Sequence, residues 1–524
     1  MLRRTIHGRR GVDGQTSTVG NQYLGRAVAT GIVGCLCLFG CSKVSTGDGP
    51  AAGGTVENGG RTANSGGAAA GGAQGGHSNV GGRSAGGSAT GGASIAGGAT
   101  GSDTGGVTGG DTGGAGGDSQ GGVGGDDTGG AGGSDTGGAG GAGGATQPDA
   151  ASGGSATSST ATFLHVEGNR LLDGNGKAAR FTGVNWFGFE TSNEAPHGIW
   201  ARDYRSMLKQ MADLGFNSVR LPWSNAIMRP DAKVVNGAFN SNGADPYDQT
   251  NPMNGSLGGK SPLEIMDLIV AAAGEFGIKI ILDNHSREPD GYMTEPLWYT
   301  AKTSEQQWIA DWVTLVKRYK GNTAVVACDL DNEPFGAASW GTGVQATDWN
   351  SAAERCGNAI LAANPDVLII VEGVSVVGTD VYWWGGNLSA VRTAPIVLSK
   401  PEKLVYSAHE YGPEVHDQTW FTDATFPNNL AKVWDQHFDF IMSQGIGHLL
   451  LGEFGIKDRA ASAGKSGVWF DTLLKTVGAT YSWTFWCWNP NSGDTEGILQ
   501  YDWLTPQQWK IDALKPYLAP MIGK

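Results

Sequence analysis

Residues 262–285, PLEIMDLIVAAAGEFGIKIILDNH, contain the pattern that decides the fold of this 524-residue chain. Apolar residues recur at helical spacing over Pro262–Phe276, and Ile278–His285 is a short apolar run that ends in polar residues. A helix that leads directly into a buried strand is the repeating unit of parallel sheets. The stretch therefore predicts an α/β fold.

The same alternation of short apolar runs and longer amphipathic segments continues on both sides of this stretch. Strands are expected at Arg180–Phe189, Asn217–Trp223, Ile278–His285, Ala324–Glu333, Asp366–Gly373, Lys403–Tyr411, Gly447–Phe454 and Tyr481–Trp488. Helices are expected at Ala201–Leu214, Pro262–Phe276, Glu305–Tyr319, Trp349–Ala363, Leu430–Ser443, Gly467–Val477 and Pro506–Leu514. The fifth unit is the weakest, because the residues around Trp383 read as a loop. Eight such units predict a closed (β/α)8 barrel, the TIM-barrel fold.

The chain before these units has a composition that cannot form a core. Between Ser42 and Thr162 there is no Leu, no aromatic residue and no Cys, and 41 of the residues 51–150 are Gly. Such a segment cannot bury enough apolar surface to offset the entropy lost on ordering. We expect residues 42–161 to be a disordered linker rich in Gly, Ser, Thr and Asp, and residues 162–524 to be one folded domain.

Asp-Thr-Gly-Gly recurs within this linker, but the copies lack the regular nonapeptide and the apolar position of a calcium-binding solenoid. A flexible coil is therefore favoured. About 118 residues of Gly-rich coil would have an r.m.s. span of roughly 60 Å.

Residues 1–41 have the features of a secretion signal. Arg26 precedes an apolar run over residues 27–40, which is short for a membrane span but long enough for the apolar part of a signal peptide. Leu38-Phe39-Gly40-Cys41 resembles a bacterial lipobox, in which the Cys is lipidated, and Ile32-Val33-Gly34-Cys35 competes with it. We expect export and anchoring through Cys41 in a bacterial outer membrane, with simple secretion as the alternative.

Charge and composition exclude several classes of partner. The formal net charge is −14, and the sequence has no basic stripe of the kind that binds nucleic acid. No Gly-rich phosphate loop follows a strand and no cysteine spacing fits a metal site, so neither a cofactor nor a metal is expected. Cys328, Cys356 and Cys487 are expected to be buried free thiols, and the protein is expected to be a monomer.

Several expected strands end in polar residues, at the end where barrel enzymes carry their active sites. These ends are Arg220, Asp283-Asn284-His285, Asn332-Glu333-Pro334, His409-Glu410-Tyr411, Gly452-Glu453-Phe454-Gly455 and Trp486. Glu333 and Glu453 each follow an apolar strand, where an unpaired carboxylate is costly to bury. The structural alternative is that each of them forms an ion pair with Arg220 or a Lys. Two such residues indicate the carboxylate pair that cleaves a glycosidic bond, one protonating the leaving oxygen and the other attacking or activating water.

Longer motifs make this interpretation specific. The motifs are FTGVNWFGFET at 181–191, Asn332-Glu333-Pro334, YWWGGN at 382–387, Gly452-Glu453-Phe454-Gly455 and WTFWCWNP at 483–490. Together they resemble glycoside hydrolase family 5, within the bacterial endo-β-1,4-glucanases of clan A. The resemblance covers residues 162–520 and implies retaining, endo-acting hydrolysis of cellulose or related β-glucans by the folded domain.

The resemblance also implies a role for individual residues. Glu333 would be the general acid/base and Glu453 the nucleophile. Six further residues would surround the reacting sugar: Arg220, His285, Asn332, His409, Tyr411 and Trp486. Trp200 and Trp384 would stack on the flanking glucose units.

Two positions depart from the pattern of the family. Asp331 stands where close relatives often have His, and its charge is expected to raise the pKa of Glu333. Ser192 stands where some relatives have a disulfide-bonded Cys.

Two kinds of function are the alternatives to a β-1,4-glucanase. One is a mannanase, xyloglucanase or mixed-linkage glucanase on the same fold. The other is a surface protein that binds glycan without catalysis.

Overall fold

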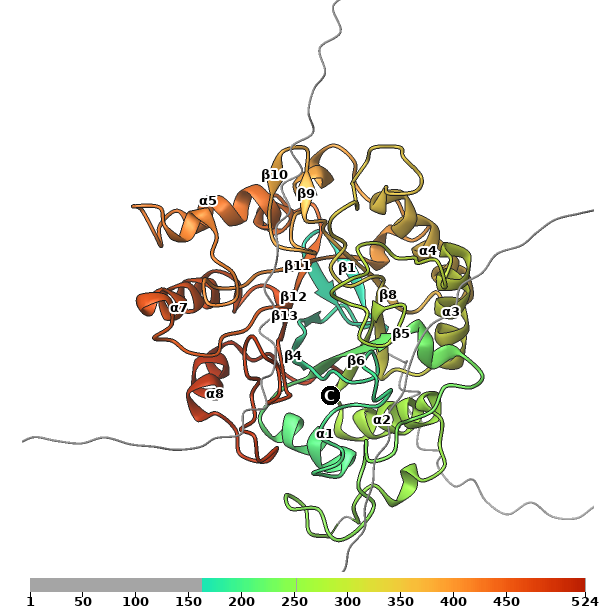
Figure 1. The fold of residues 1–524 in the computed structure, drawn as a ribbon. Coiled ribbons are helices and arrows are strands. Elements are labelled where there is room, and N and C mark those ends of the chain that lie inside the picture. The colour runs from blue at the N-terminus through green and yellow to red at the C-terminus, as the bar shows by residue number, and fades with distance from the viewer. Residues whose placement is uncertain (1–162, 251, 524) are drawn as a thin grey trace, which may run out of the picture. The chain divides into compact units, whose positions relative to one another are not determined.

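The computed structural model describes residues 163–250 and 252–523. The expected signal peptide (1–41), the expected linker (42–161) and Cys41 lie outside the described residues. Figure 1 shows the strands gathered at the centre of the folded domain, with the larger helices outside them. This is the arrangement expected of a TIM barrel.

Eight parallel strands form the closed barrel. They are β4 (Thr182–Asn185), β5 (Ser218–Ser224), β6 (Lys279–Ser286), β7 (Val325–Asp329), β8 (Leu368–Glu372), β11 (Leu404–His409), β12 (His448–Glu453) and β13 (Ser482–Phe485). The last strand closes on the first, with Thr484 paired to Gly183. The predicted (β/α)8 barrel is confirmed.

All eight α-helices in the described residues lie where the seven helical segments are predicted, because α5 and α6 fall within a single predicted segment. They are α1 (Tyr204–Asp213), α2 (Pro262–Phe276), α3 (Glu305–Arg318), α4 (Trp349–Ala363), α5 (Leu430–Trp434), α6 (Phe440–Ser443), α7 (Lys465–Val477) and α8 (Gln508–Leu514). The helix α2 has strong end signals: the Ser261 and Glu264 side chains form a capping box, Pro262 opens the helix, and Gly277 ends it with φ of 81°. These local signals explain why its bounds match the prediction.

Other segments differ from the expectation. No α-helix lies between β8 and β11, in agreement with the weak fifth unit; the described chain there forms β9 (Val376–Val377), β10 (Asp380–Val381) and the 3-10 turns Ser389–Arg392 and Pro401–Lys403. The helix predicted at Leu430–Ser443 is divided by a π-helical turn at Asp435–Asp439. Several strands are shorter than predicted, because residues past their last paired position turn into the loops that carry the polar side chains.

A small antiparallel sheet that the sequence analysis did not predict precedes the barrel. It contains β1 (His165–Glu167), β2 (Arg170–Leu172) and β3 (Ala178–Ala179). Its apolar residues join the lower ends of the barrel strands in one buried cluster, which we call the barrel floor. The barrel floor consists of Leu164, Leu171, Phe181, Ile281, Val326, Ala327, Leu368, Ile370, Val405, Leu450 and Ile522.

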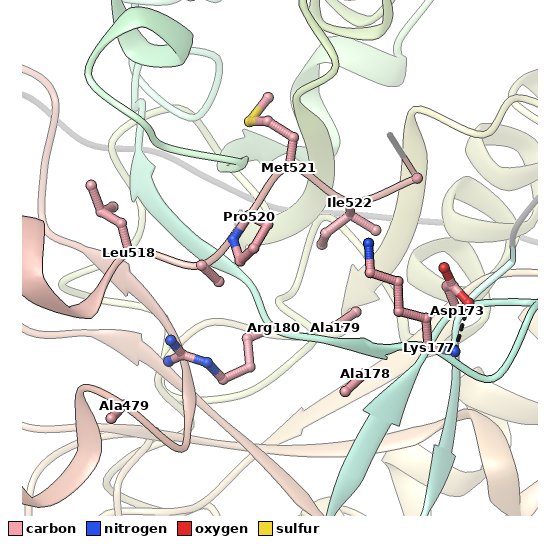
Figure 2. A pocket seen from close by; sticks show the side chains of 12 residues that line it. Asp173, Lys177, Ala178, Ala179, Arg180, Ala479, Leu518, Pro520, Met521 and Ile522 are labelled. Atoms are coloured by element: carbon pink, nitrogen blue, oxygen red, sulfur yellow. Dashed lines mark hydrogen bonds between the residues drawn. The ribbon is translucent and has the colours of Figure 1, made fainter.

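A cavity of about 360 Å³ lies beside this floor (Figure 2). It is lined by Asp173, residues 177–180, Ala479 and residues 518–523, all of which lie before the starts of β4 and β13 or at the C-terminus. Arg180 in its wall already donates hydrogen bonds to three carbonyl oxygens, those of Gly478, Tyr481 and Tyr517. The cavity is therefore at the end of the barrel opposite the polar strand ends.

Cys328, Cys356 and Cys487 are buried free thiols, as predicted. Among residues 163–523, apart from the undescribed position 251, no helix has the length and apolar character to cross a bilayer.

Candidate active site

Arg220 is fully buried among acidic side chains at the carboxyl ends of the strands. The sequence placed it near the end of its strand, but it is the third of the seven residues of β5. Its guanidinium donates hydrogen bonds to Asn185 (3.1 Å), Asp329 (2.9 Å), Asn332 (2.9 Å), Glu372 (2.9 Å) and Glu453 (2.8 Å), and pairs with Asp283 at 3.0 Å. A planar cation with five donors is suited to bind several oxygens at once. Burial disfavours its charge, but the surrounding carboxylates outweigh burial and raise the pKa of Arg220 well above its usual range.

The acidic residues around Arg220 and their histidine partner form one connected group, which we call the mouth cluster. It consists of Arg220, Asp283, Asp329, Glu333, Glu372, His409 and Glu453. It joins β5, β6, β7, β8, β11 and β12 with the segment after β7.

Glu453 is the last residue of β12 and is 4 % exposed. One of its oxygens accepts from Arg220 at 2.8 Å, and the other accepts from the Tyr411 hydroxyl at 2.7 Å. Gly452, the residue before it, has no side chain, and this lets β12 pack closely against β11. A Cβ on Gly452 would meet His409 Nε2 at 2.9 Å and Ser407 Oγ at 2.6 Å. Charge-assisted hydrogen bonds of this kind stabilise an ionised carboxylate. Both carboxylate oxygens of Glu453 are therefore fixed in place.

Glu333 lies four residues beyond the end of β7, not within the strand as predicted. Its φ of 52° places it in the left-handed region, which is costly for a residue with a side chain. The Glu372 carboxylate holds this conformation by accepting from the backbone N–H of Glu333 at 2.8 Å. The strained backbone turns the Glu333 side chain toward His409, whose Nδ1 lies 2.9 Å from its carboxylate.

The two carboxylates predicted to form a pair do lie together. One oxygen of Glu333, one oxygen of Glu453 and a ring nitrogen of His409 all lie within 4.8 Å of one another. Carboxyl groups about 5–5.5 Å apart are the spacing of retaining glycosidases, and inverting enzymes need a wider gap. The approach of Glu333 and Glu453 therefore agrees with the spacing of retaining glycosidases.

The surroundings of the pair separate the two groups electrostatically. Burial raises the pKa of Glu333, and the charges of Glu453 and Glu372 raise it further, against the opposing bond from His409. The pKa of His409 is raised well above its usual range, because the charges of Glu372 and Glu453 outweigh the effect of its burial. The raised pKa favours the protonated form of Glu333, as a general acid requires.

His285 and Trp486 form an aromatic wall beside the carboxylates. The Asp283 carboxylate lies 2.7 Å from His285 Nδ1, and this contact orients the ring. The rings of His285 and Trp486 are stacked with centroids 5.6 Å apart, and Phe187 stacks on Trp486 at 5.5 Å. Trp486 is partly exposed, so the wall is not closed off from the surface. An aromatic face of this kind suits the apolar face of a sugar ring.

Trp200 and Trp384 are also partly exposed, but they contact different parts of the domain. Trp200 packs edge-on against Trp503, with ring centroids 5.0 Å apart. Trp384 stacks on Phe335 at 3.8 Å, and Phe335 is two residues after Glu333. Trp384 thus contacts the segment that carries Glu333.

Sequence reasoning missed Glu372, Asp329 and Asn185, which are all fully buried and bonded to Arg220. Glu372 bonds both Arg220 and the Glu333 backbone and approaches His409 Nε2 at 3.2 Å. Its signal was present, because it ends the otherwise apolar strand LIIVE. Asp283, Asp329 and Glu372 could form a ligand set for a metal ion, but the guanidinium of Arg220 binds all three.

Asp331 does not act on Glu333 in the way the sequence analysis expected. Its carboxylate is buried and pairs with Arg287, which also lies 3.5 Å from Glu295. The charges that raise the pKa of Glu333 are those of Glu453 and Glu372. Burial raises the pKa of Asp331 itself to about 7, against the opposing charge of Arg287.

Ser192, the second position that departs from the family pattern, is exposed. Its backbone N–H donates to Asp290 at 3.0 Å.

With this geometry in place, comparison with known proteins gives a direct answer. Residues 172–492 match the family described as Cellulase (glycosyl hydrolase family 5). The chain belongs to glycosyl hydrolase family 5. It is similar to an endoglucanase of Paenibacillus polymyxa, with 44 % identity over 365 residues that cover 69 % of this chain and 88 % of that protein. It is also similar to the major extracellular endoglucanase of Xanthomonas campestris pv. campestris, with 41 % identity over 353 residues, 66 % of this chain and 69 % of that protein.

Solved structures of the family agree. The catalytic domain of the Xanthomonas campestris pv. campestris enzyme superposes with a TM-score of 0.61 at 38 % identity, covering 68 % of this chain and 99 % of that domain. A cellotetraose complex of the endocellulase from Pyrococcus horikoshii gives a TM-score of 0.61 at 36 % identity, covering 69 % of this chain and 99 % of that one. The family 5 chain described here is thus a glycoside hydrolase of the endoglucanase type.

Proposed function

We propose that this protein hydrolyses internal β-1,4-glucosidic bonds of cellulose or a related β-glucan with net retention, using Glu333 as acid/base and Glu453 as nucleophile. The observation that carries the proposal is the approach of the two carboxylates within 4.8 Å, one of them bound to Arg220 and Tyr411 and the other with a raised pKa. The names of the relatives, which are endoglucanases, support the β-glucan substrate.

In the first step, Glu453 attacks the anomeric carbon while the glycosidic C–O bond breaks. The proton of Glu333 goes to the leaving oxygen, so the departing sugar is neutral and an α-glycosyl ester forms on Glu453. In the second step, water gives its proton to Glu333 and attacks the same carbon, and the ester bond breaks. Two inversions return the β-anomer and regenerate both carboxyl groups.

The surrounding residues support this sequence of steps. Arg220 and Tyr411 orient Glu453 through both oxygens, at 2.8 and 2.7 Å. Asn332 is fixed by Arg220 at 2.9 Å and stands next to Glu333, where it can bond the reacting sugar. The second set of contacts is aromatic: Trp486 with His285 borders the reacting sugar, and Trp200 and Trp384 stack on its neighbours.

The stereochemical claim is tested by proton NMR of the first products from cellohexaose, before mutarotation mixes the anomers. We expect the β-anomer at the new reducing end. Early release of the α-anomer would rule out direct attack by Glu453.

Chemical rescue assigns the two roles separately. We expect Glu333→Ala and Glu453→Ala each to lose activity by roughly a thousandfold or more. Glu333→Ala removes acid–base catalysis, and Glu453→Ala removes covalent catalysis. With azide and an aryl β-cellobioside, Glu333→Ala should release β-cellobiosyl azide, because azide replaces water in the second displacement. Glu453→Ala should release the α-azide, because azide then attacks once from the opposite face. An exchange of the two products would mean that the roles are reversed.

The preferred glycan is decided by initial rates on carboxymethyl-cellulose, mannan, xyloglucan and mixed-linkage glucan. We expect the highest kcat/KM on the β-1,4-glucan. A higher value on mannan would correct the substrate, and no hydrolysis of any of the four would favour the non-catalytic alternative.

We further propose that the protein is exported and anchored through a lipid on Cys41. The apolar run before Cys41 supports export, as does the similarity to an endoglucanase named as extracellular. Radiolabelled palmitate should enter the full chain in a bacterial host and should not enter Cys41→Ala. Label that remains in this variant would point to Cys35 or another site.

A further inference from the structure

Glu410 stands between two residues of the active site. Its neighbours His409 and Tyr411 contact Glu333 at 2.9 Å and Glu453 at 2.7 Å. Because successive side chains along an extended chain point to opposite sides, the Glu410 side chain points away from the sugar site and into the layer of helices. It is 0 % exposed. The catalytic steps make no use of this buried acid.

Three donors from three different elements meet at the Glu410 carboxylate. The indole N–H groups of Trp434 in α5 and Trp469 in α7 both donate to its Oε1 at 3.0 Å. The hydroxyl of Tyr382 donates to its Oε2. Its backbone N–H also bonds the carbonyl oxygen of Glu453 at 3.1 Å. A carboxylate has only acceptors, so it is the group that can satisfy three buried donors at one point.

Tyr382 is the first residue of segment 382–387, which includes Trp384. At Gly385 and Gly386 this segment lies so close to the catalytic residues that only glycine fits. A Cβ on Gly385 would meet a Glu372 oxygen at 2.3 Å and the Glu333 Cα at 3.3 Å, and a Cβ on Gly386 would meet the His409 carbonyl oxygen at 2.7 Å. Trp384 thus lies between two fixed points, Tyr382 at the Glu410 carboxylate and the two glycines against the catalytic residues.

Trp384 stacks on Phe335, which shares the chain segment of Glu333. Since Glu333 donates its proton to the leaving oxygen, a sugar on Trp384 belongs to the leaving group. We propose that Glu410 is a positioning residue: it fixes segment 382–387 through Tyr382 and so sets where Trp384 holds the leaving-group sugar against Glu333. This inference rests on the roles proposed above for Glu333 and Trp384.

The test compares Glu410→Gln with wild type on two substrates. The amide keeps the shape of the side chain but brings an N–H₂ group to a place where donors already point, so at least one buried donor loses its acceptor. On cellohexaose we expect kcat/KM to fall roughly tenfold or more. On an aryl β-cellobioside, whose leaving group is not a sugar, we expect a change of less than about threefold. An equal loss on both substrates would overturn the positioning role.

A double-mutant cycle with Trp384→Ala tests the route of the effect. If Glu410 acts through Trp384, then Glu410→Gln changes cellohexaose kcat/KM by less than about twofold in the Trp384→Ala background. Effects that multiply independently would overturn the proposal. The matched control is Glu402→Gln. Glu402 is an exposed carboxylate just before β11, the strand that leads to Glu410, and this variant should have the wild-type kcat/KM on both substrates.

Tyr382→Phe is the second variant, for the case that Glu410→Gln does not fold. It removes one donor and keeps the ring that stacks on His437 at 3.8 Å, so it should show the same substrate dependence. A Tyr382→Phe enzyme with the wild-type ratio of the two activities would also overturn the inference. A failure of the proposed function is separate, because wild type would then not hydrolyse the aryl cellobioside through Glu453.

Discussion

The barrel floor and the mouth cluster are built from the same strands but have opposite chemistry. In β8, Leu368 and Ile370 belong to the floor, and Glu372, two residues further on the same face, belongs to the mouth. In β6, Ile281 is in the floor and Asp283 in the mouth. Apolar burial at the floor stabilises the fold, whereas each buried charge at the mouth costs free energy that its partners must offset. The comparison teaches that in β6, β7, β8, β11 and β12 one part of the strand stabilises the fold and the carboxyl end carries the buried charges.

The largest difference is expected when the cation of the mouth cluster is removed. Arg220→Met leaves four carboxylates without the donor that pairs them, so we expect a loss of about 3–5 kcal/mol in the free energy of unfolding and of nearly all activity. Chemical denaturation and a cellulose-derivative assay measure both. The exposed pair of Arg205 and Glu275 is the control, and Arg205→Met should cost less than about 1 kcal/mol. Equal losses in the two variants would remove the contrast between mouth and surface.

A change in the floor should affect stability alone. Leu368 is fully buried, and Leu368→Ala should lower the free energy of unfolding by about 2–5 kcal/mol through lost burial and a cavity. Well below the melting temperature, kcat should stay within about twofold of wild type. A large loss of kcat with little loss of stability would show that floor and mouth are coupled.

Tyr411→Phe removes one hydrogen bond from the mouth and should have the reverse signature. A bond to a charged group is worth about 1.5–3 kcal/mol, so kcat should fall roughly tenfold to a hundredfold. The phenyl ring keeps its packing, so no cavity forms and the free energy of unfolding should fall by no more than the value of that bond. Unchanged kcat would mean that the contact of 2.7 Å to Glu453 is not needed to orient the nucleophile.

The smallest effect is a shift in pH dependence. Burial, Glu453 and Glu372 raise the pKa of Glu333, and activity is lost as pH rises through that pKa because the acid must be protonated. Glu372→Gln removes one of these charges, lowers the pKa of Glu333 and should move the alkaline limb of kcat/KM to lower pH by up to about one unit. The position of the limb, not the height of the profile, is the measurement. A limb that stays in place or moves to higher pH would assign the effect to other groups.

The sequence predicted what depends on local pattern. The barrel, the helix bounds of α2 and the pairing of Glu333 with Glu453 follow from periodicity, capping residues and polar strand ends. The small sheet β1–β3 was missed although Gly174-Asn175-Gly176 is a turn signal, because strands of two or three residues show no periodicity.

What the sequence could not give depends on contacts between distant residues. Glu372 is one residue at the end of an apolar strand, and its part in holding Glu333 appears only when β7 and β8 lie side by side. Asp331 shows the opposite case. It is two residues from Glu333 in the sequence, but its partner is Arg287, which is 44 residues away. Proximity along the chain was therefore a poor guide to electrostatic influence.

Both ends of the described chain join the barrel floor, through Leu164 and Ile522. The described chain thus begins and ends on the side of the strand starts. A tether, a binding module or a solid support fused there would leave the catalytic side facing outward, free to meet an insoluble polymer. The same layout allows the enzyme to be displayed on a surface from either terminus without covering its substrate side.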